Sequence, residues 1–476
     1  MMKMRMVQTF WSGKRSLMHE GFGWRHPEYH LMAWALSCLK LNEQGFPIVL
    51  YTDSEGYDVL IKKMHLPYTE AIVKYDDLPC QACQWAYAKV ETYSIQKEPF
   101  IHVDSDVFLS QPLSESILES GLVAQNKESG TAYYREMAER LLQRKAKISD
   151  YLEEGLQKES IPSYNMGIFG GCDLDFIHDY CKEIFRFFGD NKMDDAEGPI
   201  SNVACNVVFE QMFFAILAES KHRRVTCVLK HTMPDNGYTR EEFCDLQHDG
   251  KKAVFHIIGG HKQNATICDL IGKILIRDYP DYFEKILSLF PSCNLRLEKS
   301  KASLFTDVSI QKCMAQYEDF LLNAERKWRN LSNDRLFELE KKVSRCLNFL
   351  NATEEEQKRM CIKKHPYLWI FTIPKTWLPG ATELLGSRLQ MSGLKKISDV
   401  VIIPTLMGRG LKEISIDDLG FNIVELSGEQ IAYEKLYASL VPCFNGKLQN
   451  NTEEIRKCVN KEMAYLLYQG AVLATT

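Results

Sequence analysis

Two aspartates separated by one residue, Asp104 and Asp106, are the first candidates for chemistry in the sequence. They follow a mostly apolar run, 100–103, that is typical of a buried strand. Residues i and i+2 project to one side of an extended chain, so both carboxylates would lie together where the strand ends. Hard oxygen ligands of this kind suit Mg²⁺ or Mn²⁺ carrying a phosphorylated substrate. Acidic triplets are common at this composition, and we interpret another one, 173–175, as a helix cap.

A second segment runs from a strand-like stretch into a glycine turn and carries His256, Gly259 and Lys262. The histidine can complete a metal site, the glycine lets the backbone approach an anion, and the lysine can hold a phosphate as a point charge. Taken alone, the segment fits a histidine buried in the core and a solvated lysine in a turn better than it fits a ligand-binding site. Together with the carboxylate pair, it supplies both halves of a clamp for a metal ion and a diphosphate.

The order of these motifs resembles the metal-dependent GT-A glycosyltransferases, especially the glycogenin-like and lipopolysaccharide-galactosyltransferase-like retaining families. The resemblance covers about residues 5–290: the Asp-x-Asp strand of these enzymes is similar to 104–106, and their late His-x-x-Gly-x-x-Lys motif is matched in full. It implies that a Mn²⁺ or Mg²⁺ ion is held by Asp104, Asp106 and His256. It also implies that the nucleotide-diphosphate donor is contacted by Ser105, Gly259 and Lys262.

Three further positions extend the resemblance: Lys89 lies ahead of the Asp-x-Asp strand, and Asn165 and Gln211 lie between the two motifs. Asn165 lies in an Asn-x-Gly strand that helps to form the sugar and acceptor pocket, and Lys89 lies on a helix that offers a basic residue to the donor. Gln211 belongs to a Glu-Gln pair where the family often has Asp-Gln. With Asp104 and Asp106, these three residues form the catalytic set that the resemblance implies. Outside the resemblance, a lysine on an amphipathic helix is normally solvated.

The ends of the first two strands form the candidate pocket for the nucleotide base. The resemblance implies that Thr9, Phe10 and Trp11, with Tyr51 and Asp53, bound this pocket. Aromatic residues at strand ends are usually core or rim packing, so both interpretations stay open at this point.

The sequence departs from the glycogenin-like pattern at its front. Trp11-Ser-Gly-Lys14-Arg15 stands where those families usually carry an Asp- or Tyr-rich nucleotide turn. The first domain is closer to a bacterial family of unassigned glycosyltransferase-like proteins, which it resembles at residues 51–53, 102–106 and 164–171. The resemblance therefore implies the fold more firmly than the donor.

These side chains need a scaffold, and the first 290 residues alternate strand-like runs with helical runs. The alternation predicts an α/β fold, which the resemblance identifies as GT-A (Rossmann-like): a mostly parallel sheet with helices on both faces and a ligand site at the carboxyl ends of the strands. The predicted strands are 6–11, 47–53, 100–108, 165–169, 225–229 and 253–257. The predicted helices are 29–40, 83–95, 176–187 and 206–218.

We predict three parts: a GT-A-like catalytic domain over 1–295, a helical linker region over 296–360 and a small α+β, winged-helix-like module over 361–476. In the linker region, apolar residues recur on one helical face at Leu336, Leu339, Val343 and Leu347. Gly470 fits a helix C-cap. The module is predicted to have strands at 367–373, 400–406, 413–416 and 422–426, followed by helices near 429–440 and 452–469.

The module is similar to the winged-helix leader-peptide recognition domains of ribosomal-peptide maturation systems, on its hairpin and the helical segments that follow Gly428 and begin at Thr452. Such domains bind an extended peptide by adding it as a strand to an exposed sheet edge. This resemblance implies a peptide acceptor and a role in peptide modification. A compact appendage that stabilises or dimerises an enzyme is the alternative.

Composition excludes several classes of protein. The 476 residues are 45% hydrophobic and 25% charged, as in ordinary globular proteins. A net charge of −5 gives no basic excess for nucleic acid or anionic lipid, so a polyanion would need a local site. The 15 scattered cysteines indicate buried thiols in a reducing compartment, and no apolar run is long enough to span a membrane. We therefore expect a cytoplasmic protein.

The sequence as a whole predicts a metal-dependent glycosyltransferase that moves a sugar from a nucleotide-diphosphate donor, a UDP-sugar first, to a hydroxyl acceptor. The resemblance adds retention at the anomeric carbon. The alternative from another class is a nucleotide-sugar or glycan-binding module without turnover, or a peptide-tethering adaptor. A phosphatase or nuclease would need further acidic ligands nearby, and His102 alone does not supply them.

Overall fold

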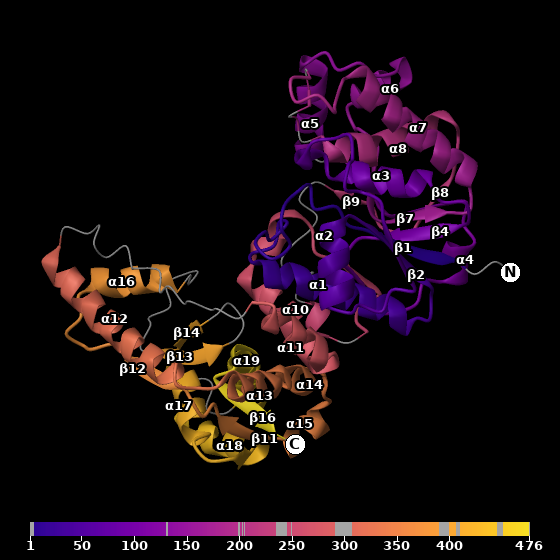
Figure 1. Ribbon diagram of the computed structural model, residues 1–476. Coiled ribbons are helices and arrows are strands. Elements are labelled where there is room, and N and C mark those ends of the chain that lie inside the picture. The colour runs from indigo at the N-terminus through magenta and orange to yellow at the C-terminus, as the bar shows by residue number, and fades with distance from the viewer. Residues whose placement is uncertain are drawn as a thin grey trace. The chain divides into compact units, whose positions relative to one another are not determined.

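The structure is a computed structural model that divides into two compact units, Met1–Ile271 and Gly272–Thr476 (Figure 1). The predicted boundary at residue 295 lies outside the described residues, and the three-part division with its second boundary at 360 stays a prediction. The residues that the structure describes are 4–129, 132–198, 200–201, 203, 205–234, 245–248, 250–290, 307–389, 399–405, 410–444 and 451–475.

The first unit is built on one eight-stranded sheet in the order β3-β2-β1-β4-β7-β6-β8, with β9 paired to β6. All pairings among these described strands are parallel except β4–β7 and β6–β7, which confirms the predicted mostly parallel α/β class. The strands are β1 (Arg5–Thr9), β2 (Ile48–Thr52), β3 (Glu70–Val73), β4 (Phe100–Val103), β6 (Leu122–Ser129), β7 (Ser163–Gly171), β8 (Val225–Cys227) and β9 (Met233–Pro234).

Helices cover both faces of this sheet: Figure 1 shows α1 on one side and α3, α7 and α8 on the other. The α-helices of the unit are α1 (Pro27–Glu43), α2 (Ser54–Gly56), α3 (Ala86–Ser94), α4 (Glu115–Leu118), α5 (Ala132–Gln143), α6 (Asp150–Leu156), α7 (Leu174–Asp190), α8 (Phe213–Ser220) and α10 (Ala265–Asp278), which continues into the second unit. Shorter helical turns are the π-helices Tyr57–Lys63 and Val208–Met212 and the 3-10 helices Ala82–Gln84, Asp245–Gln247 and Gly259–Gln263.

Strand β1 shows why these residues form the centre of the sheet. Its inner residues are all buried, and successive side chains point to opposite faces. Gln8 donates to the Ser37 hydroxyl of α1 at 3.0 Å, whereas Thr9 donates to the Thr92 hydroxyl of α3 at 2.8 Å. A strand buried on both faces needs helices above and below it, as the alternating sequence predicted.

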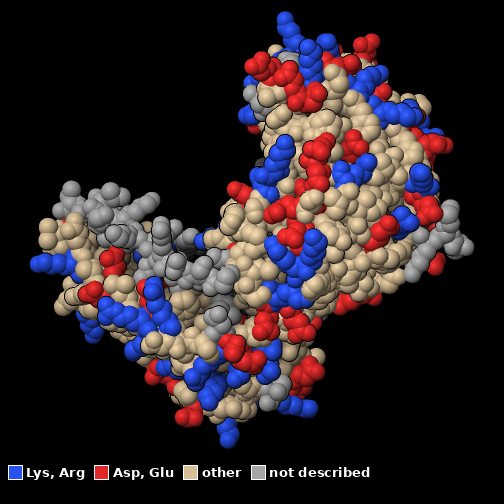
Figure 2. Space-filling model, viewed as in Figure 1, with Lys and Arg blue, Asp and Glu red and all other residues tan. Residues whose placement is uncertain are grey.

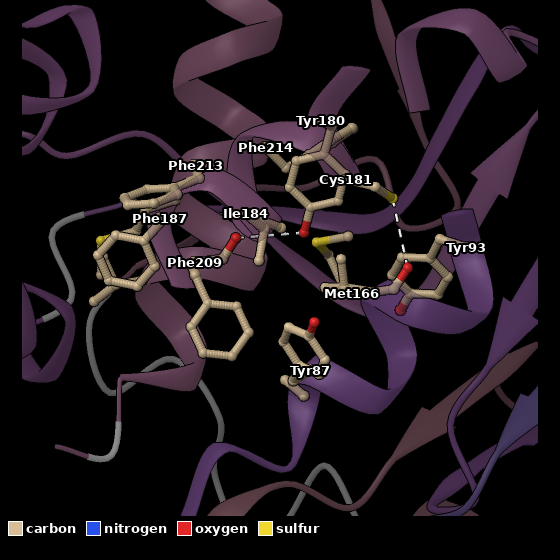
Figure 3. Close-up of a cluster of buried hydrophobic side chains, with 14 of the residues drawn as sticks. Tyr87, Tyr93, Met166, Tyr180, Cys181, Ile184, Phe187, Phe209, Phe213 and Phe214 are labelled. Atoms are coloured by element: carbon tan, nitrogen blue, oxygen red, sulfur yellow. Dashed lines mark hydrogen bonds between the residues drawn. The ribbon is translucent and has the colours of Figure 1, made fainter. Parts of the chain in front are cut away.

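Helices α3, α7 and α8 enclose an aromatic core (Figure 3). Asp173 caps the start of α7: its carboxylate accepts the Phe176 N–H at 3.1 Å, so the predicted cap is confirmed. Further along α7, the Tyr180 hydroxyl donates to the backbone carbonyl of Glu210 at 2.7 Å. Glu210 lies in the π-helix Val208–Met212, a widened turn within the predicted helix 206–218. The core therefore anchors the turn that carries this carboxylate.

The chain order reverses between β1 and β4. From β1 the chain continues to β2 and β3 on one side, and from β4 it continues to β6 and β7 on the other. Connections that diverge in this way leave a crevice outside the carboxyl ends of the two strands, where ligands bind in open α/β sheets. Phe10 and Asp104 are the first residues beyond these two ends.

The second unit contains two three-stranded antiparallel sheets, β15-β11-β16 and β12-β13-β14. Their strands are β11 (Cys361–Lys364), β12 (Trp369–Thr372), β13 (Asp399–Thr405), β14 (Gly410–Ile416), β15 (Ile431–Ala432) and β16 (Val472–Thr475). The helices are α11 (Pro280–Ser288), α12 (Val308–Trp328), α13 (Asn333–Ser344), α14 (Cys346–Asn351), α15 (Glu354–Arg359), α16 (Pro379–Arg388), α17 (Asp418–Leu426), α18 (Tyr433–Leu440), α19 (Thr452–Gln469) and the 3-10 turn Val441–Cys443.

Most local predictions for the second unit are confirmed. The predicted helices appear as α18 and α19, and Gly470 caps α19 with a left-handed φ of 86°. The apolar face over Leu336–Leu347 is buried. The predicted strand 422–426 is wrong: this segment belongs to α17, because Asp417 accepts the Gly420 N–H at 3.0 Å and starts a helix there. The last residue of the predicted run 400–406 lies outside the described residues.

Surface and chain chemistry add three observations. Among the described helices, none is both long and apolar enough to cross a membrane. Every described cysteine is free. On the face shown in Figure 2, the Lys and Arg side chains are interspersed with Asp and Glu side chains instead of being gathered by sign.

His365 makes the stability of the second unit depend on pH. Burial lowers its pKa from 6.5 to about 4, and its Nδ1 atom accepts the Tyr367 N–H at 3.2 Å. Because the unfolded chain takes up the proton more readily, stability falls as the pH drops from 6.5 toward 4, by about 2 kcal/mol at pH 5. His365→Asn keeps an acceptor for the N–H but does not titrate. Thermal unfolding midpoints at pH 7 and pH 5 should therefore differ less in the variant, and an equal difference would contradict this assignment.

Candidate functional site

A cavity of about 540 Å³ lies at the carboxyl ends of β1 and β4. Its walls come from the ends of both strands, the loop that follows β1, helix α1, the start of α3 and the turn Gly259–Gln263. The residues predicted from the sequence that line it are Thr9, Phe10, Trp11, Lys89, Asp104, Ser105, Asp106, Gly259 and Lys262.

Asp104, Asp106 and His256 converge beside this cavity, with one possible ligand atom from each lying within 4.8 Å of the others. The expectation of a single strand over 100–108 is wrong: β4 ends at Val103, and the Val107 N–H donates to the Asp104 carbonyl at 3.1 Å in a turn. Strand β5 (Val107–Leu109) then pairs antiparallel with β10 (Val254–His256), with His256 opposite Val107. This separate two-stranded sheet is what brings the histidine to the aspartates.

Lys89 joins two buried carboxylates next to this group. Its Nζ atom lies 2.8 Å from Asp104 Oδ2 and 2.7 Å from Glu210 Oε1. Burial alone would lower the pKa of Lys89, but the two carboxylates outweigh burial and raise it above its usual value. Burial raises the pKa of Glu210 to about 7 and also raises the pKa of Asp104, while Lys89 opposes both shifts. Lys89 is therefore charged, and its two partners compete for it.

Asp106 is the better charge-compensated of the two aspartates. Its Oδ2 atom forms an ion pair with Lys262, and its Oδ1 atom lies 3.4 Å from His256 Nε2. Burial would raise the pKa of Asp106, but Lys262 and His256 hold it well below its usual value. Each of the two aspartates thus has one carboxylate oxygen next to a lysine.

Strand β7 supports His256 from behind. A Cβ atom on Gly167 would lie 2.6 Å from two atoms of the His256 ring and 2.6 Å from the side-chain carbonyl of Gln125. The Gly167 carbonyl also accepts the Asp104 N–H at 2.8 Å. The glycine of the Asn-x-Gly motif is therefore required by the close approach of the imidazole.

Asn165 and Gln211 belong to a polar network that is not part of the cavity wall. Asn165 accepts the Gly167 N–H at 3.0 Å and donates to Glu128 at 3.1 Å. Tyr134 donates to the other Glu128 oxygen and lies 2.5 Å from the Gln211 side chain. The two residues can position β7, and their predicted catalytic roles stay predictions.

Tyr51 and Asp53 are buried and are also absent from the cavity wall. Asp53 accepts the Ser12 N–H at 2.7 Å and the Gly56 N–H at 2.9 Å, so it caps α2 and fixes the loop after β1. Its carboxylate therefore supports the pocket through Ser12, next to Trp11, and its predicted contact with the base is untested.

The cavity has an aromatic and cationic wall that the sequence did not predict. Its members are Arg15, Phe22, Trp24, His30, Trp34 and Trp85. Arg15 stacks over Phe22 at 4.4 Å from the ring centroid, and Phe22 lies 4.9 Å from the His30 ring. Five of these residues lie in the loop after β1 or on the buried helix α1, where neither strand nor helix periodicity distinguishes a wall residue from packing. The one sequence signal that could have indicated a loop there is the glycine-rich stretch 21–23.

His30 has a defined protonation state in this wall. Its Nε2 atom accepts the Trp34 indole N–H at 2.9 Å, so its Nδ1 atom carries the hydrogen. Burial, with Lys262 nearby, lowers the pKa of His30 to about 3. The neutral His30 ring therefore presents an Nδ1–H donor next to Phe10 and Phe22.

Comparison with known proteins identifies the family of the chain. A family model described as "Family of unknown function (DUF6734)" matches residues 4–289, and the chain belongs to this family. No curated protein matches the sequence. Among solved structures, mouse xyloside xylosyltransferase 1 in its apo form matches with a TM-score of 0.26 and 10% identity, over 49% of this chain and 85% of that chain. Similarity this distant carries no functional information.

Gly167→Ala should displace His256, because the added methyl group cannot fit beside the imidazole. We expect Mn²⁺ affinity to fall by about tenfold or more, as happens when the support of a metal ligand is lost. Isothermal titration with Mn²⁺ measures this. Gly189→Ala in α7 is the control, since a Cβ there meets no atom within 4 Å. Equal Mn²⁺ affinity in both variants would show that Gly167 does not support His256.

Lys89→Met should destabilise the first unit, because Asp104 and Glu210 lose their common cation. Removing one partner from a buried ion pair costs about 3–5 kcal/mol. The double variant Lys89→Met/Glu210→Gln should recover part of this loss, since one buried charge is gone. Urea unfolding at pH 7 gives both free energies. If the single and double variants are equally stable, Glu210 does not depend on Lys89.

Proposed function

Since its family carries no assigned activity, we propose from the site that this protein is a metal-dependent glycosyltransferase acting on a nucleotide-diphosphate sugar. The observation that carries the proposal is the convergence of Asp104, Asp106 and His256 beside a cavity that also presents two lysines. The same cavity has aromatic walls at Phe10, Trp11 and other positions, and these suit a planar base. Carboxylates for a metal, cations for phosphates and rings for a base are thus gathered in one place.

The donor set fits a divalent ion. Two carboxylates and one imidazole are ligands that Mn²⁺ accepts and Mg²⁺ tolerates. The Nδ1 atom of His256 is buried without a hydrogen-bond partner in the described part of the chain. The Nε2 atom of the same ring lies 3.4 Å from Asp106 Oδ1, so this nitrogen is the one that faces the aspartates and would bind a divalent ion.

A divalent ion bound at these residues would supply Lewis-acid stabilisation of the diphosphate leaving group. Lys89 and Lys262 both line the cavity, so their ammonium groups can stabilise the same developing negative charge. Lys89 is held in place by Glu210 and needs no reorientation. The aromatic wall excludes water and orients the base, which leaves the sugar near the aspartates. Asn165 and Gln211 act in this proposal by positioning β7 beside the sugar.

The acceptor is a hydroxyl group, and retention at the anomeric carbon is the expected outcome from the sequence resemblance. A peptide acceptor recruited by residues 361–476 is part of the proposal. Its support is that strands β12 and β14 are the edges of a three-stranded antiparallel sheet, the kind of edge on which a peptide can add a strand. A binding module without turnover is the competing function.

The double variant Asp104→Asn/Asp106→Asn should lose metal-dependent release of the nucleoside diphosphate. The purified protein is incubated with UDP- and GDP-sugars and Mn²⁺, Mg²⁺ or EDTA. We expect release to fall by roughly two orders of magnitude or more, the scale of losing a group that stabilises developing charge. The matched control is Asp175→Asn in the other acidic triplet, where the side chain is exposed.

The outcomes separate the competing functions. Undiminished release in the double variant would contradict the metal assignment. Metal-dependent binding of a donor by the wild-type protein, with no release under any condition, would favour the binding module over the transferase.

A further inference from the structure

Lys262 is the counter-ion of Asp106, one of the three side chains that would hold a divalent ion. Its Nζ atom is paired with Asp106 Oδ2, and His256 Nε2 lies 3.4 Å from the other carboxylate oxygen. Both side chains are largely buried, with 19% of Lys262 and 10% of Asp106 exposed, so water screens the pair weakly. The protein thus neutralises this carboxylate with one of its own cations.

Lys89 behaves differently because it has two partners. It contacts Asp104 at 2.8 Å and Glu210 at 2.7 Å, and Glu210 is 1% exposed. If Asp104 turns toward a metal ion, Lys89 keeps the buried Glu210 carboxylate and stays where it is. Among the described residues, Lys262 has no second carboxylate within ion-pair distance. A metal ion at Asp106 therefore leaves Lys262, and not Lys89, without a counter-ion.

The Lys262 side chain has open space beside it, because it lines the cavity. The preceding Gly259 has a left-handed φ of 50°, and a Cβ atom on Gly259 or Gly260 would meet nothing within 4 Å. The ammonium group lies 5.9 Å from the Trp24 ring, and both residues line the cavity. An anion bound in the cavity is the nearest new partner for the displaced lysine.

We propose that Lys262 is a built-in counter-cation of the metal site, which exchanges Asp106 for the donor's diphosphate when the metal ion binds. The inference rests on the proposed function. Without a diphosphate, a divalent cation must displace the ammonium group and leave it unpaired next to another positive charge. With a diphosphate present, the ammonium group gains an anionic partner instead. Metal and diphosphate therefore raise each other's affinity by the same factor.

The test measures Mn²⁺ binding to the full chain, from the electron paramagnetic resonance signal of free Mn²⁺, alone and with saturating UDP or uridine. In the wild-type protein, UDP should raise Mn²⁺ affinity by about fivefold or more, within the usual range of coupling between sites. Uridine, which lacks the diphosphate, should not. The affinity of UDP should rise by the same factor when Mn²⁺ is present.

Three variants isolate the lysine. Lys262→Met should bind Mn²⁺ alone about fivefold more tightly than the wild-type protein, because the competing cation is gone, and its response to UDP should shrink. Lys262→Arg keeps the charge and should behave like the wild-type protein. Lys74→Met, at an exposed position after β3, is the matched control and should change neither affinity. Circular dichroism confirms that each variant is folded.

Failure of this inference can be told apart from failure of the proposed function. If the wild-type protein binds Mn²⁺ and UDP but the coupling is below twofold, the exchange is overturned without any variant. The same holds if Lys262→Met binds Mn²⁺ alone no more tightly than the wild-type protein. If neither protein binds Mn²⁺ even with UDP, the metal site itself is wrong and both proposals fall.

Discussion

The charge balance beyond the end of β4 is the constraint on which the arrangement of the first unit depends. Asp104, Asp106 and Glu210 are three carboxylates in a poorly solvated space, and Lys89 and Lys262 are the two cations that compensate them. Buried charges need partners at hydrogen-bonding distance, since solvent cannot compensate them. The α3 helix, the π-helical turn and the glycine turn must each deliver one charge to a common point. This requirement, together with apolar packing, fixes where each of these three elements lies relative to the charged group.

With all three carboxylates ionised, this group would carry one negative charge more than its two lysines compensate. Two lysines make three carboxylates tolerable, while the pKa of Glu210 stays raised to about 7 by burial. A site with no internal cations would be difficult to bury at all.

The sequence predicted the parts of this site that depend on local pattern. Strand and helix periodicity located the sheet and its covering helices. The functional candidates were found because they lie at or just beyond the ends of predicted strands: Asp104, Asp106, His256 and Lys262. Their exact geometry was not predictable, because the turn after Val103 and the pairing of β5 with β10 depend on contacts about 150 residues apart in the chain. The wall residues Phe22, Trp24 and Trp34 were missed, since aromatic residues in a loop or a buried helix look the same whether they line a cavity or fill a core. Segment 422–426 was assigned to a strand because its apolar residues outweighed the Asp417 cap.

The loop after β1 and the turn that carries Lys262 are joined by two hydrogen bonds. The Arg25 N–H donates to the Lys262 carbonyl at 3.1 Å, and the Gln263 side chain donates to the Gly23 carbonyl at 2.7 Å. These bonds hold the loop of the aromatic wall and the turn that carries Lys262 against each other, although more than 230 residues separate them in the chain. A small aromatic compound that only fills the space between the rings would also restrain the lysine's backbone. A compound that binds this cavity would then not need a phosphate group to affect the lysine beside Asp106.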